Sequence, residues 1–238
     1  MVLNDAAPDR QATAAAVARR DAVIALTVCA ALVIAFIAWI RLGAHVEVAA
    51  QPAVHITMAD AVAIGHDYPQ VLPTADTLRP VMLPDNWDGR RPDYAGYVWY
   101  RIDAPAGMAD RARPAIYLPA AGMNAEVWLN GLRAGGGGRM DWPPSRHFYS
   151  PQLIELPRGL WRRDAGPDEL WVLVAGHPGY RSGLAPVWLG DHAELQGAWR
   201  WRSFWQSEGT GITMVINIVL AILVLAIGWR DRGHTAYV

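Results

Sequence analysis

The sequence predicts an all-β protein, an antiparallel two-sheet sandwich flanked by two transmembrane α-helices. Two stretches, 22–40 and 211–229, each hold nineteen residues without a charge. As helices they would be about 28 Å long, close to the hydrocarbon thickness of a bilayer. Between them, apolar residues alternate with a period of two, which is typical of strands. Turn-forming residues separate these runs about every ten residues, a spacing typical of β-sandwiches.

The two apolar stretches divide the chain into a tail (1–21), a signal-anchor helix (22–40), a main domain (41–208), a second helix (211–229) and a tail or the start of a further region (230–238). Arginines precede the first helix and follow the second. The positive-inside rule then predicts both termini on the cytoplasmic side and the main domain on the other side. All 21 basic residues are arginine, which indicates GC-rich coding and hence a bacterial inner membrane with the main domain in the periplasm. A cleaved signal peptide is the alternative, but it would have a shorter apolar region ending in small residues.

Composition excludes several classes of function. The chain has 238 residues, 21 Lys and Arg residues that are all arginine, and a net charge of −1. Without a basic stripe, a nucleic-acid partner is not expected. The single cysteine, Cys29, lies in the first apolar stretch, so we expect neither a disulfide nor thiolate chemistry in the main domain.

The strand pattern is clearest in two places. In Gly96–Asp103, Val98, Tyr100 and Ile102 share one face. Residues 125–129 also alternate and lead into Asn130-Gly131, a dipeptide typical of a type I′ hairpin turn. Further strands are expected at 115–118, 153–156, 169–175 and 185–189, with opening strands around 46–48 and 56–64. Gly135 to Gly138 are expected to form a flexible hairpin end, and no amphipathic helix is expected between the apolar stretches.

Four segments follow one another in an order that resembles the sugar-binding domain of glycoside hydrolase family 2. They are LPDNWDGRRPDYAGYVWYRIDAP (83–105), AEVWLNGLRAG (125–135), YSPQLIELPRGL (149–160) and DELWVLVAG (168–176). They contain Leu-Pro-x-x-Trp, Gly-x-x-Trp-Tyr-Arg and Val-x-x-Asn-Gly patterns similar to those of the family. The resemblance extends over these four segments, residues 83–176, and implies a jelly-roll sandwich of the galactose-binding type.

The same domain type occurs outside the membrane in bacterial seven-transmembrane receptors with diverse intracellular signalling modules, and in related sensor histidine kinases. A jelly roll followed by a membrane span is similar to that arrangement. The resemblance therefore implies a ligand-sensing part of a signal-transduction receptor, with carbohydrate as a candidate class of ligand. Two alternatives remain open: a membrane-tethered glycan-binding or assembly module without signalling, and the leading non-catalytic domain of a family 2-like glycosidase.

Sugars are held by aromatic faces together with planar polar side chains, because a pyranose ring has apolar C–H patches ringed by hydroxyls. The proline-rich loop 141–149 supplies Trp142, Arg146, His147 and Tyr149. A second cluster, 177–181, supplies Tyr180 and Arg181 and is expected on the same rim. The alternative is structural, with Trp142 and Tyr149 capping the sandwich and Arg146 paired with a carboxylate.

Six aromatic residues in or beside strands are expected to pack in the core: Trp87, Trp99, Tyr100, Trp128, Trp171 and Trp188. Other aromatic and arginine residues beside the apolar stretches suit the lipid headgroup region, where such side chains are favoured. The expected membrane-interface residues are Trp39, Arg41, Trp199, Trp201, Trp205 and Trp229. The lipid bilayer is therefore an expected partner, and small residues in the helices permit a homodimer.

Metal, cofactor and catalytic motifs are not recognisable in the sequence. The seven histidines lack ligand spacing, and the turn around Asp85 and Asp88 fits an Asx turn better than a calcium loop. Asp85 with Asp88, or Asp164 with Asp168, are the carboxylate pairs available for glycoside hydrolysis. Both pairs lie in Pro/Gly-rich loops, so we expect no enzymatic activity in this chain.

Overall fold

The computed structural model describes residues 53–147, 150–163 and 166–208, parts of 213–224, and scattered positions between 16 and 38. The chain forms two compact units, Met1–Ala49 and Ala50–Val238. In the first unit the described residues are helical and exposed. There the Thr27 hydroxyl donates to the Val23 carbonyl, four residues earlier, at 2.8 Å.

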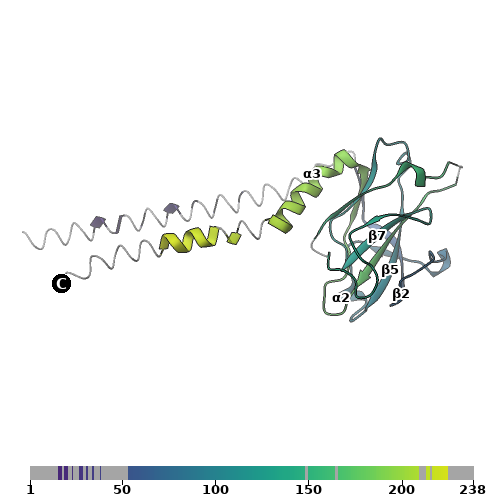
Figure 1. Ribbon diagram of the computed structural model, residues 1–238, viewed down its shortest axis with the longest axis horizontal. Helices are drawn as coiled ribbons and strands as arrows, with labels where there is room; N and C mark the ends of the chain where they lie inside the picture. The colour runs from purple at the N-terminus through teal and green to yellow at the C-terminus, as the bar shows by residue number, and fades with distance from the viewer. Residues whose placement is uncertain are drawn as a thin grey trace, which may run out of the picture. The chain divides into compact units, whose positions relative to one another are not determined.

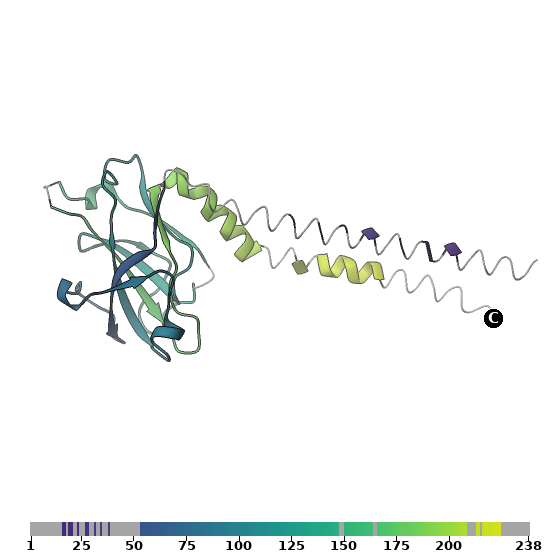
Figure 2. The same cartoon turned by 180° about the vertical axis from the view of Figure 1, so that it is seen from behind.

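The second unit contains two antiparallel sheets, as predicted (Figures 1 and 2). The four-stranded sheet has the order β1 (Val54–Ile56), β12 (Val187–Asp191), β6 (Pro114–Leu118) and β9 (Gln152–Glu155). The six-stranded sheet has the order β3 (Arg79–Met82), β2 (Met58–Gly65), β5 (Gly96–Asp103), β10 (Glu169–Gly176), β7 (Asn124–Leu129) and β8 (Leu132–Gly136). A third, short pairing joins β4 (Asp85–Asn86) to β11 (Gly183–Leu184). The helices are α2 (Trp87–Arg90) and α3 (His192–Ser203), with short turns η2 (Ala75–Thr77), η3 (Arg158–Leu160) and η4 (Phe204–Glu208).

The main core fills the space between the two sheets. On β5, Val98, Tyr100 and Ile102 point into this core, as the alternation predicts. Trp99, on the opposite face, packs edge to face on Trp128 and Trp171, with ring centroids 5.8 and 6.0 Å apart. The outer face of the six-stranded sheet therefore has an aromatic cluster of its own. Of the six expected core aromatics, Trp87, Trp99, Tyr100 and Trp171 are buried, whereas Trp128 and Trp188 are half-buried.

In the hairpin formed by β7 and β8, the predicted turn is confirmed, whereas the predicted flexible end is partly wrong. Asn130 and Gly131 both have positive φ, 52° and 82°, as a type I′ turn requires. Gly135 to Gly138 do not form only a flexible hairpin end, because β8 extends to Gly136. A Cβ on Gly135 would lie 2.7 Å from the Ile154 side chain of β9. Glycine there therefore lets β8 approach the other sheet closely.

Helix α3 is an element that the sequence did not predict. It begins with a capping box, in which Asp191 accepts a hydrogen bond from the helix and Glu194 accepts one from the Asp191 N–H. Leu195 and Ala198 are buried against Ala115 and other residues of the four-stranded sheet. Because few residues of this helix are apolar and buried, its arginine- and tryptophan-rich sequence shows little helical periodicity.

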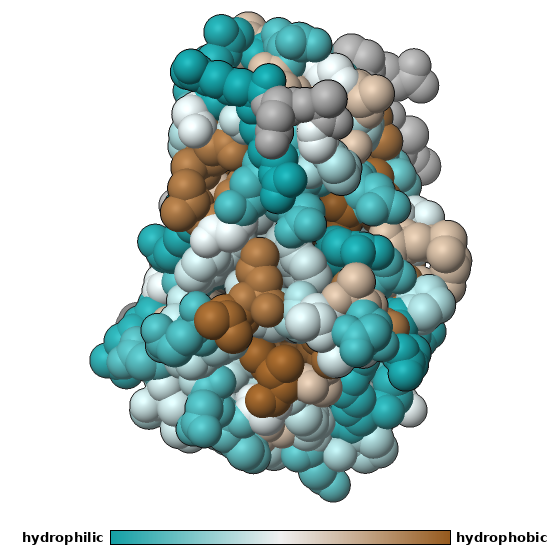
Figure 3. Space-filling view, turned by 90° about the vertical axis from the view of Figure 1, so that its right-hand side faces the viewer, coloured by the Kyte–Doolittle hydropathy of each residue, from teal (hydrophilic) through white to brown (hydrophobic). Residues whose placement is uncertain are grey.

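The surface carries apolar side chains in small groups. Met58 and Met82 face each other across β2 and β3 and are exposed, as is Leu132. The face seen in Figure 3 is mostly hydrophilic, with separate hydrophobic patches between polar side chains. Small separate patches of this kind are ordinary on protein surfaces and do not by themselves indicate a binding site.

The two predicted transmembrane stretches lie largely outside the described residues. In the second stretch, 213–214 and 216–224 are helical, and the Asn217 amide donates to the Thr213 carbonyl at 2.9 Å. None of the helices in the described parts of the chain is long and apolar enough to cross a membrane. Trp39, Arg41, Trp229 and the tail 230–238 also lie outside the described residues.

Candidate functional site

One end of the six-stranded sheet brings three loops together. Strand β10 lies between β5 and β7, and its Ala175 pairs with Tyr97 on one side and Asn124 on the other. Because the strands are antiparallel, the loop that leaves β10 meets the segments that enter β5 and β7. Two sequence-predicted clusters, 141–149 and 177–181, belong to loops at this end.

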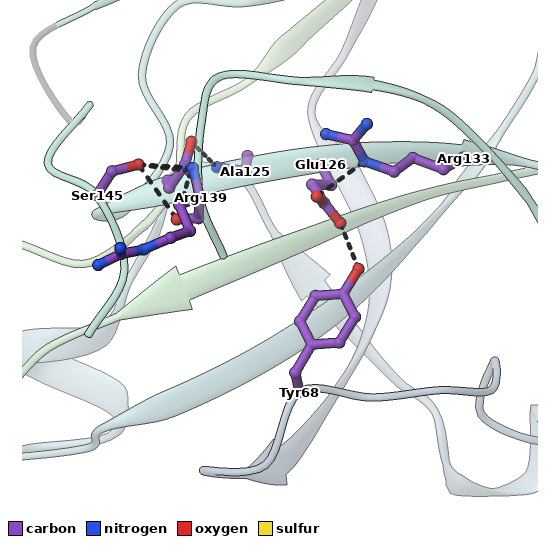
Figure 4. A network of polar contacts seen from close by, with 7 residues as sticks. Tyr68, Ala125, Glu126, Arg133, Arg139 and Ser145 are labelled. Carbon is purple, nitrogen blue, oxygen red and sulfur yellow. Dashed lines mark hydrogen bonds and ion pairs between the residues drawn. The ribbon is translucent and has the colours of Figure 1, made fainter. Parts of the chain in front are cut away.

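The first loop is closed at its base by polar contacts (Figure 4). Arg139 and Ser145 exchange hydrogen bonds at 2.9 Å, and the Asn124 amide donates to both the Arg139 carbonyl and the Ser145 hydroxyl. The His147 N–H then donates to the Met123 carbonyl at 2.7 Å. These contacts tie the loop to the start of β7, so that its tip, with Trp142, is presented outward.

The second loop turns sharply after β10. The Tyr180 N–H donates to the His177 carbonyl, with Pro178 next and Gly179 at φ 78°. Proline followed by glycine with positive φ is the sequence of a type II turn. Gly176, just before the turn, has no room for a Cβ, which would lie 2.0 Å from the Trp87 ring.

Side chains of the two loops meet in an aromatic cluster. The Trp142 and His177 rings are parallel, with an interplanar angle of 4° and centroids 5.4 Å apart. The Arg146 guanidinium lies over the Tyr180 ring, 4.9 Å from its centroid, and Tyr180 packs edge to face on His177. His66, from the segment after β2, packs edge to face on Trp142. We call His66, Trp142, Arg146, His177 and Tyr180 the rim cluster.

A cavity of about 310 Å³ adjoins this cluster, within the size range of small-molecule sites. One wall is the loop 177–182, which includes His177, Tyr180 and Arg181. The opposite wall is formed by α2 and the residues that follow it, namely Trp87, Asp88, Arg91, Pro92, Asp93 and Tyr94. The cavity therefore combines aromatic rings with two guanidinium and two carboxylate groups.

The α2 wall begins at an Asx turn, as the sequence predicts. The Asn86 side chain caps α2 by accepting from the Asp88 N–H at 3.1 Å. Behind this wall, Asp85 is buried and accepts hydrogen bonds from Tyr100 at 2.7 Å and from Arg91 at 2.8 Å. Burial first, and then the charge of Asp85, raises the pKa of Tyr100.

A second buried carboxylate holds the segment that carries His66. Glu126 accepts a hydrogen bond from the Tyr68 hydroxyl at 2.7 Å and one from Arg133 at 2.8 Å (Figure 4). Burial, aided by Glu126, raises the pKa of Tyr68. Tyr68 is thereby anchored to β7, two residues from His66.

The structure places the predicted binding residues as follows. Trp142, Arg146 and Tyr180 lie together in the rim cluster, and Arg181 is exposed on the cavity wall. His147 is half-buried at the base of its loop, and Tyr149 lies outside the described residues. The sequence reasoning missed His66 and the α2 wall, because no spacing signal links these segments to the two loops. Ligand binding by these residues stays a prediction.

The predicted membrane-interface residues that are described divide into two groups. Trp199 is half-buried against the four-stranded sheet, and its indole N–H donates to the Pro151 carbonyl at 3.0 Å. Trp201 and Trp205 contact each other further along, with centroids 5.6 Å apart. Trp199 is thus part of the sandwich packing, and contact of all three with lipid stays a prediction.

The described residues include few side chains that could bind a metal ion or act in catalysis. Within the described part of the chain, no three His, Cys, Asp or Glu side chains are grouped so as to hold a metal ion. Of the carboxylates considered above, Asp85 is engaged by Tyr100 and Arg91. Asp168 accepts hydrogen bonds from the Asn130 amide and the Arg162 N–H.

Comparison with known proteins gives matches among solved structures alone. No protein-family model matches the sequence, and no curated protein matches it. A calcium-binding mutant of Bacteroides uniformis β-glucuronidase 2 is 19% identical, with a TM-score of 0.41, and the match covers 58% of this chain and 18% of that one. A GH2 β-galacturonidase from Eisenbergiella tayi is 16% identical, with a TM-score of 0.40 and coverage of 58% and 24%. A GH2 member from Bacteroides cellulosilyticus is 14% identical, with a TM-score of 0.43 and coverage of 58% and 20%. The chain thus spans about a quarter or less of the length of these three structures.

Proposed function

We propose that this chain is a carbohydrate-binding β-sandwich module whose ligand binds at the rim cluster and the adjoining cavity. The observation that carries the proposal is the pairing of stacked rings with an arginine beside a cavity. One face of Trp142 is covered by His177, yet 43% of Trp142 remains exposed. An exposed ring held in a fixed orientation suits the apolar C–H face of a sugar.

The charges of the cavity favour a neutral, hydroxyl-rich ligand. Arg91 and Arg181 are matched by Asp88 and Asp93 on the cavity wall. Guanidinium groups only donate hydrogen bonds and carboxylates only accept them, whereas a sugar hydroxyl does both. A wall with both groups therefore suits hydroxyls. The carboxylate of a uronate would be repelled by the two aspartates as well as attracted by the two arginines, so its charge brings little advantage.

We propose further that this module is the periplasmic, ligand-sensing part of a bacterial signal-transduction receptor. The two uncharged stretches, the arginines beside them and the family resemblance support a module held between two membrane helices. The packing of α3 on the four-stranded sheet also supports it, because α3 precedes the second apolar stretch in the chain. If a ligand has a higher affinity for the sandwich when α3 is in one of two positions, its binding would shift the helix toward that position.

Sugar binding is tested by titration calorimetry on the full chain in lipid nanodiscs. The ligands are methyl glycosides of galactose, glucose, mannose and glucuronic acid. We expect a neutral glycoside to bind, and Trp142→Ala and Arg146→Ala each to weaken binding about tenfold or more, from the loss of a stacking or polar contact. Arg163→Ala, an exposed arginine outside the site, is the matched control. Equal binding by both variants and wild type would place the ligand elsewhere.

Membrane orientation is tested separately, with alkaline phosphatase fused after residue 238 or inserted at the exposed turn Ala106–Gly107. The proposal expects activity from the insertion and none from the terminal fusion, because the enzyme is active only in the periplasm. The reverse pattern would contradict the proposed orientation.

A further inference from the structure

Asp85 is a buried charge directly behind the cavity wall. Its side chain is 0% exposed, and Oδ2 accepts hydrogen bonds from Arg91 Nη1 at 2.8 Å and from the Tyr100 hydroxyl at 2.7 Å. Arg90 Nε lies 3.6 Å from Oδ1. Gly183 packs on the Asp85 main chain, where a Cβ would lie 1.9 Å from the Asp85 carbonyl oxygen. The carboxylate is thus held by the fold and not by solvent.

The same network reaches two residues of the cavity wall. The Trp87 indole N–H donates to the Tyr100 hydroxyl at 2.7 Å, and that hydroxyl donates to Asp85. The Arg91 guanidinium also lies 5.9 Å from the centroid of the Trp87 ring. Both Trp87 and Arg91 line the cavity, so one buried carboxylate orients its largest ring and one of its cations.

Stability alone is a weak explanation for such a group. Burying an ion pair costs desolvation free energy that its attraction often fails to offset, and an apolar replacement is commonly neutral or stabilising. An arginine fixed beside a cavity, by contrast, has lost conformational entropy before a ligand arrives. That pre-organisation raises affinity for a ligand whose oxygens match the guanidinium fork.

We infer that Asp85 is a positioning residue that fixes Arg91 for hydrogen bonding with a sugar. Through Tyr100 it also holds the buried Trp87 ring, over which the Arg91 guanidinium lies. The inference rests on the proposed function. It also predicts which sugars bind more tightly, because the planar guanidinium of Arg91 can donate hydrogen bonds to two neighbouring hydroxyl oxygens of a sugar ring. A glycoside that lacks one of such a pair binds less tightly.

The test uses the full chain and a readout that needs no ligand. Phenylglyoxal modifies accessible arginines, and mass spectrometry measures its rate at Arg91. In Asp85→Asn, which keeps the side-chain volume, we expect Arg91 to react several-fold faster than in wild type. Asp60→Asn is the matched control, since Asp60 pairs with Arg101 at 2.6 Å in a half-exposed pair outside the cavity. An unchanged rate at Arg91 in a folded Asp85→Asn protein would overturn the inference.

Affinity gives the second readout, with methyl β-galactopyranoside and methyl β-glucopyranoside as ligands. We expect Asp85→Asn and Arg91→Lys each to weaken binding about tenfold or more, because a charge-assisted hydrogen bond is lost or misdirected. The 2-deoxy analogue of the tighter glycoside should lose affinity for wild type but little for Arg91→Lys. Wild-type affinity retained by Asp85→Asn would overturn the positioning role.

Two further outcomes are distinguishable. If Asp85→Asn fails to fold by circular dichroism, Tyr100→Phe takes its place, since it removes the link between Asp85 and Trp87 alone. Unchanged sugar affinity in Tyr100→Phe would then overturn the Trp87 part of the inference. If wild type binds neither glycoside, the proposed function fails for these sugars, whereas the Arg91 reaction rate still decides whether Asp85 holds Arg91.

Discussion

The indole N–H of Trp199 in α3 donates a hydrogen bond to the main-chain carbonyl of Pro151, 3.0 Å away. Pro151 directly precedes β9, and the Ser150 N–H before it donates to the His147 carbonyl at 2.8 Å. His147 ends the described part of the loop that carries Trp142 and Arg146. A short path of hydrogen bonds therefore joins the base of the candidate binding loop to α3.

Replacing Trp199 with phenylalanine tests this link. Trp199→Phe keeps an aromatic ring against the four-stranded sheet but leaves the Pro151 carbonyl without its donor. A lost hydrogen bond of this kind costs about 1 kcal/mol. We expect that decrease in the free energy of unfolding in urea, together with faster hydrogen exchange along α3. Trp201→Phe is the control, and equal exchange in both variants would contradict the role of the link.

Gly176→Ala should disturb the cavity wall. A Cβ at this position would lie 2.0 Å from Trp87 Cζ3 and 2.9 Å from the Ser182 Cβ. Because both neighbours are buried, we expect overpacking to cost about 1–3 kcal/mol. Thermal unfolding measures the cost, and tryptophan fluorescence reports the displaced ring. Gly159→Ala, where nothing lies within 4 Å of the new Cβ, should change neither, and a silent Gly176→Ala would contradict the packing described above.

Alkaline pH should destabilise the protein through its buried tyrosines. Burial raises the pKa values of Tyr68, Tyr97 and Tyr100. Above about pH 10 the unfolded chain loses these protons while the folded protein keeps them, so the free energy of unfolding falls as pH rises. The slope is at most about 1.4 kcal/mol per pH unit for each fully buried tyrosine.

Urea unfolding between pH 9 and pH 11.5 measures this slope. The chain has no lysine, so lysine titration does not obscure the tyrosines. Tyr68→Phe should give a shallower slope than wild type. A stability that stays flat across this range would show that the tyrosines titrate alike in both states.

Asp191→Ala should weaken the start of α3. Asp191 accepts hydrogen bonds from the Ala193 N–H in α3 and from the Arg113 N–H. These bonds, that from Arg113 first, lower the pKa of Asp191. Loss of an N-cap costs about 1 kcal/mol, which urea unfolding at pH 7 measures. Asp191→Asn keeps a capping oxygen and should cost less; an equal cost would contradict the capping role.

The same carboxylate gives a dependence on acidic pH. A lowered pKa in the folded state stabilises the protein above the pKa of the unfolded chain, about 3.9, and that stabilisation is lost as pH falls through the folded value. The difference in stability between wild type and Asp191→Asn should therefore shrink between about pH 4 and pH 2. If the difference in stability between wild type and Asp191→Asn stays constant over this pH range, the lowered pKa of Asp191 does not contribute to stability.

The strands were predictable because their signals are local. Residues 96–103, 115–118 and 169–175 coincide with β5, β6 and β10 to within one residue. A short run of apolar residues between turn residues can be recognised from neighbouring positions alone, and Asn130-Gly131 supplies its own turn geometry. Helix α3 was missed because its capping box and two buried residues leave no strong period in the sequence.

The sequence by itself determined the antiparallel sandwich and the types of side chain available to bind a ligand. Tertiary structure decided which of them meet. Trp142 reaches His177, thirty-five residues away in the chain, because β8 and β10 both pair antiparallel with β7, so that the loops that leave them lie at one end of the sheet. The order of strands in a sheet depends on contacts between distant segments and not on local periodicity. For the same reason, only the fold joined the α2 wall and its buried Asp85 to the two loops.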